Sequence, residues 1–100
     1  MPTYIVKYSN LKISDKVKQR IASEITRVHN ITTGANRYFA QVIFQNLKKN
    51  DHYMGGKPIS SKEVFVNGKI RSGRTAKIKN KLILGVRNGI SNLLNLKKEN

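Results

Sequence analysis

Residues 14–30, SDKVKQRIASEITRVHN, decide the fold because their apolar side chains recur with the period of a helix. The apolar positions, with polar and charged residues between them, are Val17, Ile21, Ile25 and Val28. A spacing of three or four residues puts these side chains on one face of an amphipathic helix. Ser14 is a favoured N-cap residue, and Gly34 follows the helix where a C-terminal glycine is expected.

A strand is predicted on each side of this helix. Residues 3–8 (TYIVKY) and residues 38–47 (YFAQVIFQNL) are rich in the β-branched and aromatic side chains that strands favour. In the second strand, alternation places Ala40, Val42 and Phe44 on one face and Phe39, Gln41, Ile43 and Gln45 on the other. A strand, a helix and a second strand in this order predict a parallel, right-handed crossover unit.

The second half of the chain begins in the same way. Residues 50–61 (NDHYMGGKPISS) have the composition of a loop. Residues 63–67 (EVFVN) predict a short strand that ends in a turn at Asn67-Gly68. A second helix is predicted from about Thr75, although Gly89 inside it costs about 1 kcal/mol relative to alanine. Its apolar stripe is Ile78, Leu82, Val86, Ile90, Leu93 and Leu94.

This second unit has a strand and a helix but no closing strand before Asn100. Either another subunit completes the sheet, or the natural chain is longer, and we expect the longer chain. The length of 100 residues predicts one domain over residues 1–100 with a single core.

The composition limits the classes of protein to be considered. Twenty Lys and Arg against five Asp and Glu give a net charge of +15, either as a solvated lysine-rich surface or as a field that attracts anions. The absence of cysteine excludes disulfides and thiolate chemistry, and two histidines make a metal site unexpected. The start has no signal-peptide pattern and no apolar run approaches a membrane span, so we expect a cytoplasmic protein without membrane contact.

Pro2 is a candidate catalytic residue. If Met1 is removed, Pro2 becomes a free secondary amine, which is more basic than an ordinary α-amino group. Nearby cations or burial lower the pKa of an amine and leave a neutral base near pH 7. A protonated amine would instead act as a general acid, and a proline at position 2 is also compatible with no role at all.

Arg71 and Arg74 flank Ser72-Gly73 just before the second helix, where they can converge on one anion. Arginine binds a carboxylate with two parallel hydrogen bonds, and the start of the helix adds partial positive charge. A basic turn without function is the alternative, although cations are disfavoured at this end of a helix. His29, at the end of the first helix, is typical of a structural histidine and is a weaker candidate, and His52 is weaker still.

With Pro2, His29, Arg71 and Arg74 in this pattern, the chain resembles the tautomerase superfamily. Members of this superfamily use an amino-terminal proline that is exposed by methionine removal. The similarity is closest to the cis-3-chloroacrylic acid dehalogenase branch. The stretches that carry it are PTYIV (2–6), ITRVHNITTG (25–34), FAQVIFQ (39–45), YMGG (53–56) and VFVNGKIRSGR (64–74).

The resemblance implies an α+β tautomerase fold of two fused β-α-β units, the second without its closing strand in this chain. The sheet would be mixed, with the helices on one face, and the assembly a homotrimer. It implies a cofactor-free enzyme in which Pro2 is the general acid or base, assisted by His29, while Arg71 and Arg74 bind a substrate carboxylate. The expected activity is tautomerisation of a small 2-oxo, enol or unsaturated carboxylic acid.

Three alternatives remain open. Hydration or hydrolytic dehalogenation of 3-substituted acrylates needs a tyrosine and a glutamate that lie, in that branch, downstream of Asn100. A family member with the fold but no efficient chemistry is the second. A basic nucleic-acid-binding module is the third, although no recognised nucleic-acid motif is present and no such partner is expected. The resemblance also disfavours malonate semialdehyde decarboxylation. The related decarboxylases use an aspartate near the second strand, and no carboxylate lies between Glu24 and Asp51 here.

Overall fold

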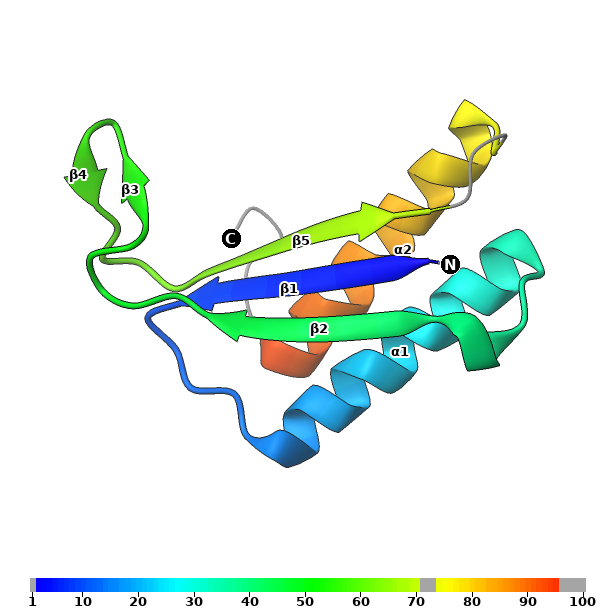
Figure 1. Cartoon of the computed structure of the whole chain (residues 1–100), viewed down its shortest axis with the longest axis horizontal. Coiled ribbons are helices and arrows are strands. Elements are labelled where there is room, and N and C mark those ends of the chain that lie inside the picture. Colours follow the sequence, from blue (N-terminus) through cyan, green and yellow to red (C-terminus); the bar gives the residue numbers. More distant parts are fainter. Residues whose placement is uncertain (1, 71–73, 96–100) are drawn as a thin grey trace.

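A three-stranded mixed sheet forms one layer of the molecule (Figure 1). The computed structural model describes residues 2–70 and 74–95. The central strand is β1 (Thr3–Ser9), which pairs in parallel with β2 (Gln41–Asn46) and antiparallel with β5 (Glu63–Lys69). The parallel pair confirms the crossover unit predicted from the first half of the sequence.

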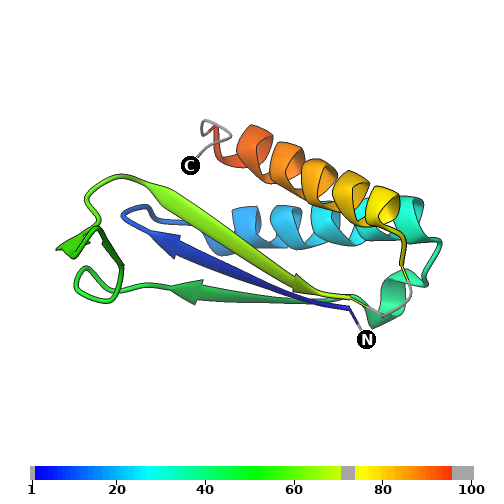
Figure 2. The ribbon, with the colours of Figure 1, turned by 90° about the horizontal axis from the view of Figure 1, so that it is seen from above.

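Two helices form the second layer, α1 (Asp15–Thr33) and α2 (Ala76–Leu94). Both lie on the same face of the sheet (Figure 2), which is the α+β arrangement that was expected. The core between the layers contains the alternate residues of β1 and the apolar stripes of both helices. Its buried members are Tyr4, Val6, Tyr8, Ile13, Ile21, Ile25, Val28, Leu82, Val86 and Ile90.

Side-chain caps define where the helices begin and end. Ser14 Oγ accepts a hydrogen bond from the Val17 amide at 3.2 Å, as its predicted N-cap role requires. Gly34 adopts the left-handed conformation, with φ of 75°, and ends α1 three residues later than expected. Thr75 Oγ1 accepts from the Ile78 amide at 3.2 Å and starts α2 where the sequence indicated.

Gly89 lies inside α2 because the two helices approach closely there. A Cβ atom at Gly89 would lie 2.6 Å from Glu24 Cγ, and one at Gly85 would lie 2.7 Å from Val28 Cγ1. Such distances are too short for ordinary packing. The helix-propensity cost of glycine is therefore offset by the close packing of α2 on α1.

The prediction of a strand over residues 38–47 is wrong at its beginning. Arg37–Phe39 form a short 3-10 turn, and β2 starts only at Gln41. The Asn36 side chain accepts a hydrogen bond from the Tyr38 amide at 2.9 Å, which holds the chain in the turn. This local hydrogen bond outweighs the strand preference of the aromatic residues. In β2 itself, Val42 and Phe44 pack on the core as predicted.

Two further predictions need correction. The loop over residues 50–61 contains a small hairpin of β3 (Tyr53–Met54) and β4 (Lys57–Pro58), with glycines at its tip. The expected turn at Asn67-Gly68 does not form, because β5 continues to Lys69 and Gly68 pairs with Tyr4 of β1.

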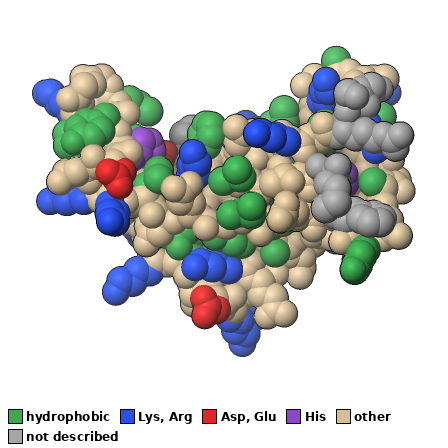
Figure 3. All heavy atoms as spheres, viewed as in Figure 1, with side chains coloured by type: hydrophobic (Ala, Val, Ile, Leu, Met, Phe, Trp, Pro, Cys, Tyr) green, Lys and Arg blue, Asp and Glu red, His purple; other side chains and the backbone are tan. Residues whose placement is uncertain are grey.

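Neither α1 nor α2 covers the other face of the sheet, and these are the α-helices of the described residues. Ile43 is 43% exposed and Phe65 is 58% exposed on this face. Figure 3 shows hydrophobic side chains gathered in its middle and Lys and Arg side chains spread around them. Within the described part of the chain, β5 is also an edge strand with no partner on its outer side.

Candidate active site

Pro2 lies at the start of the central strand. Its carbonyl oxygen accepts a hydrogen bond from the Gln41 amide at 3.0 Å, which ties it to the first residue of β2. Pro2 is buried and continues the alternation of the buried residues Tyr4 and Val6. Its ring is therefore expected on the helix side of the sheet. Met1 lies outside the described residues.

His29 meets the same end of β1 from α1. Tyr4 Oη and His29 Nδ1 are 2.7 Å apart, and both side chains are buried. The two rings meet edge to face, with centroids 5.7 Å apart and planes at 77°. Sequence reasoning identified His29 but not Tyr4, since an aromatic residue on the buried face of a strand is usually only part of the core.

Arg74 adds a positive charge beside this pair. Its Nη1 donates a long hydrogen bond of 3.4 Å to the carbonyl of Thr33, close to the end of α1. Its Nε is buried and has no hydrogen-bond partner within the described part of the chain. A buried guanidinium N–H without a partner is costly and points to a ligand. Arg71, with Ser72 and Gly73, lies outside the described residues.

Burial favours the neutral form of both titratable groups at this site, His29 and Tyr4. Burial, and secondarily the positive charge of Arg74, lower the pKa of His29 below its usual value. Burial raises the pKa of Tyr4 to about 12. At neutral pH the imidazole is therefore uncharged and the phenol keeps its proton.

Acidification is expected to destabilise the fold through His29. In the unfolded chain a histidine binds its proton near pH 6.5, while the folded state resists protonation of His29. As the pH falls through about 6.5 the unfolded state therefore binds more protons, and the free energy of unfolding decreases until the lowered pKa is passed. Thermal unfolding between about pH 7.5 and 5.5 should show this decrease in the wild type and a smaller one in His29→Gln. Equal slopes for the two proteins would contradict it.

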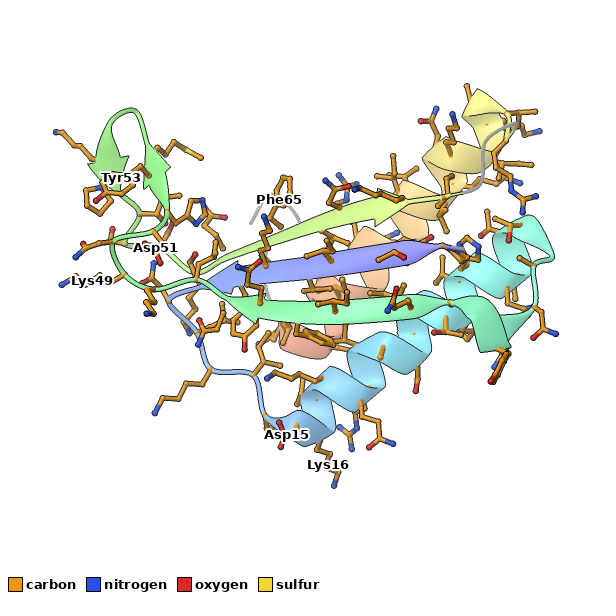
Figure 4. All side chains as sticks on the ribbon, viewed as in Figure 1. Asp15, Lys16, Lys49, Asp51, Tyr53 and Phe65 are labelled. Carbon is orange, nitrogen blue, oxygen red and sulfur yellow. The ribbon has the colours of Figure 1, made fainter. Side chains whose placement is uncertain are left out.

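The second histidine is not part of this site. His52 Nδ1 lies 2.7 Å from the Oγ of the buried Ser9, at the opposite end of β1 from Pro2. Figure 4 places its neighbours Asp51 and Tyr53 at the hairpin end of the molecule, far from the N-terminus. The Ser9–His52 contact therefore fastens the hairpin to the sheet. His29 and His52 therefore lie at opposite ends of β1.

An open groove of the described residues lies apart from Pro2. It has a volume of about 1020 Å³ and runs between β5 and α2, lined by apolar residues such as Val66, Leu82 and Val86. Tyr4 reaches its wall, but Pro2, His29 and Arg74 do not line it.

Across residues 2–70 and 74–95, no three His, Asp or Glu side chains come together as metal ligands would. Over the same residues, neither helix has the length and apolar character needed to cross a membrane.

Pro2 thus stands at the start of the central strand of a mixed sheet, with His29 and Arg74 near the same end. Residues 1–97 match the family described as "Putative oxalocrotonate tautomerase enzyme". The chain therefore belongs to this family and, through it, to the tautomerase superfamily. No curated protein sequence matches the chain.

Solved structures agree with this assignment. N1, a member of the cis-3-chloroacrylic acid dehalogenase family, is 29% identical, with a TM-score of 0.90 over 97% of this chain and 68% of its own. A native fused 4-OT is 18% identical, with a TM-score of 0.87 over 97% of this chain and 79% of its own. Another fused 4-OT, an asymmetric trimer, is 22% identical, with a TM-score of 0.84 over 97% and 78%. The last two show the fold alone.

Proposed function

We propose that the protein is a cofactor-free tautomerase of a small 2-oxo, enol or unsaturated carboxylic acid. Removal of Met1 would free the amine of Pro2, which moves a proton between the oxygen and the carbon of the substrate. The observation that carries the proposal is the environment of Arg74. Its buried Nε has no hydrogen-bond partner among the described residues and lies beside a neutral His29, at the end of the sheet where Pro2 precedes β1.

The substrate carboxylate is assigned to the arginines. Arg74 donates from Nη1 to the carbonyl of Thr33 and has no partner for Nε among the described residues, and Arg71 lies three residues before it in the sequence. A planar guanidinium matches a carboxylate with two hydrogen bonds and remains charged at all working pH values. The same charge favours the negative charge that develops on an enolate in the transition state.

The proposed base is supported by the surroundings of Pro2. Pro2 is buried, and Arg74 brings positive charge to the same end of the sheet. Both effects disfavour the protonated form of an amine. A neutral amine accepts a proton from the substrate and, once protonated, returns it to another atom. Pro2 would therefore act as base and acid within one turnover.

Hydration or hydrolytic dehalogenation is the second candidate activity, because N1 belongs to a dehalogenase family and is 29% identical to this chain. The two activities are separated by measuring ketonisation of phenylenolpyruvate and halide release from a 3-haloacrylate with the same preparation. We expect brisk ketonisation without halide release. Halide release at a comparable rate would replace the tautomerase assignment with the dehalogenase one.

We also propose that three chains assemble around the uncovered face of the sheet, in the cytoplasm where small carboxylates are available. Ile43 and Phe65 are exposed on that face, and one similar structure is a fused 4-OT trimer. Exposed apolar patches of this kind mark protein interfaces. Light scattering should give three times the chain mass of 11.4 kDa. A monomer mass at micromolar concentration would contradict the assembly.

A further inference from the structure

We propose that Tyr4 is a positioning residue that holds His29 in the tautomer with its proton on Nε2. The ring would then present an N–H donor toward the substrate carboxylate. The role in substrate binding rests on the proposed tautomerase function, whereas the tautomer itself follows from the geometry of the free protein.

The hydrogen bond between the two side chains fixes the direction of donation. Tyr4 Oη and His29 Nδ1 are 2.7 Å apart, and each residue is only 3% exposed. A neutral imidazole has one donor nitrogen and one acceptor nitrogen, while the phenol O–H must find an acceptor when buried. Within the described part of the chain, Nδ1 is the partner of the Tyr4 hydroxyl. The hydroxyl therefore donates to Nδ1, and the imidazole proton is placed on Nε2.

The opposite arrangement is less favourable. If Nδ1 carried the proton and donated it to the phenol oxygen, the buried Tyr4 O–H would have no acceptor among the described residues. A buried donor left unpaired loses its hydrogen bonds to water and gains none in return. The protonation states agree with this direction, because burial raises the pKa of Tyr4 to about 12 and keeps the phenol protonated. Burial and Arg74 also lower the pKa of His29, so that the imidazole is neutral.

Gly68 explains how the Tyr4 ring reaches this position. Gly68 lies opposite Tyr4 in the β1–β5 ladder. A Cβ atom at Gly68 would lie 2.7 Å from Tyr4 Cε1 and 2.9 Å from Tyr4 Cδ1. The ring therefore lies against the β5 backbone, in space that any other residue would occupy. This constraint accounts for a glycine within a strand, where it otherwise weakens pairing, and it restricts how far the phenol can move away from His29.

The test compares Tyr4→Phe with Tyr8→Phe, because Tyr8 is also buried on the same face of β1. Nitrogen NMR of the imidazole rings, recorded without substrate, should show the Nε2–H tautomer of His29 in the wild type and in Tyr8→Phe. In Tyr4→Phe the preference should be lost and the two tautomers should mix. The signals of His52, at the other end of the sheet, serve as an internal reference.

Kinetics give a second measurement. Tyr4→Phe should raise the KM for phenylenolpyruvate about 2- to 10-fold, as expected for one neutral hydrogen bond, with kcat changed less. A wild-type spectrum with the proton on Nδ1, or a tautomer ratio unchanged in Tyr4→Phe, would overturn the proposal. Since the spectra need no turnover, absence of ketonisation would refute the proposed function and leave the tautomer result to be judged separately.

Discussion

Pro2→Ala is expected to slow the ketonisation of phenylenolpyruvate by about 10²- to 10⁴-fold, the contribution of a well-positioned general acid or base. Alanine at the same place leaves a primary amine, which is less basic than the secondary amine of proline and lacks the ring that fixes its direction. The backbone contact of Pro2 with Gln41 uses the carbonyl oxygen, so the substitution can retain it. The fold should therefore persist.

Pro58→Ala is the matched control for this prediction. Pro58 is the other proline of the chain and lies exposed in the hairpin strand β4, away from the proposed site. Its replacement should leave the rate within about 2-fold, as for surface substitutions generally. If Pro2→Ala ketonises the enol as fast as Pro58→Ala, the base has been assigned to the wrong residue.

Arg74→Ala is expected to lower kcat/KM by about 10- to 100-fold, the equivalent of losing a charged hydrogen bond to the substrate carboxylate. The main change should be in KM, because the carboxylate is bound in the ground state as well as in the transition state. Arg74→Lys keeps the charge but not the planar fork and should recover only part of the loss.

Arg20→Ala is the control for charge, since Arg20 is an exposed arginine on α1 and its removal changes the net charge equally. It should have little effect on KM. Equal effects of the two variants would mean that the overall positive field, and not a specific contact of Arg74, attracts the substrate. Circular dichroism of both variants verifies that the fold is intact.

The parts of the fold that the sequence predicts correctly are those fixed by local patterns. The spacing of Val17, Ile21 and Ile25 and the caps Ser14 and Thr75 act within a few residues, and both helices are found where these patterns place them. The crossover follows because a strand, a helix and a strand leave few other arrangements.

The errors arise where a hydrogen bond or a distant contact outweighs propensity. The Asn36 side chain accepts a hydrogen bond from the Tyr38 amide, so the expected strand starts only at Gln41. Gly68 reads as a turn residue in the sequence, but its lack of a side chain accommodates the Tyr4 ring from a distant strand. No pattern in one sequence reports such a contact.

In the candidate site, too, some residues can be found from local sequence patterns and others only from contacts between distant elements. Residue type and position alone indicate Pro2, His29, Arg71 and Arg74, and the structure places Arg74 close enough to His29 to affect its pKa. Tyr4 was missed because its role depends on α1 and β1 meeting at 2.7 Å. A buried tyrosine next to a candidate histidine becomes informative only when the register of the strand and the face of the helix are both known.

The central claim is that the free nitrogen of Pro2 carries the proton. The most direct measurement compares two preparations of the same chain, one with Met1 retained and one with Met1 removed, each identified by intact mass. With Met1 retained, the Pro2 nitrogen is an amide and cannot take a proton. We predict that only the form without Met1 ketonises phenylenolpyruvate above the uncatalysed rate. Equal rates for the two forms would contradict the account.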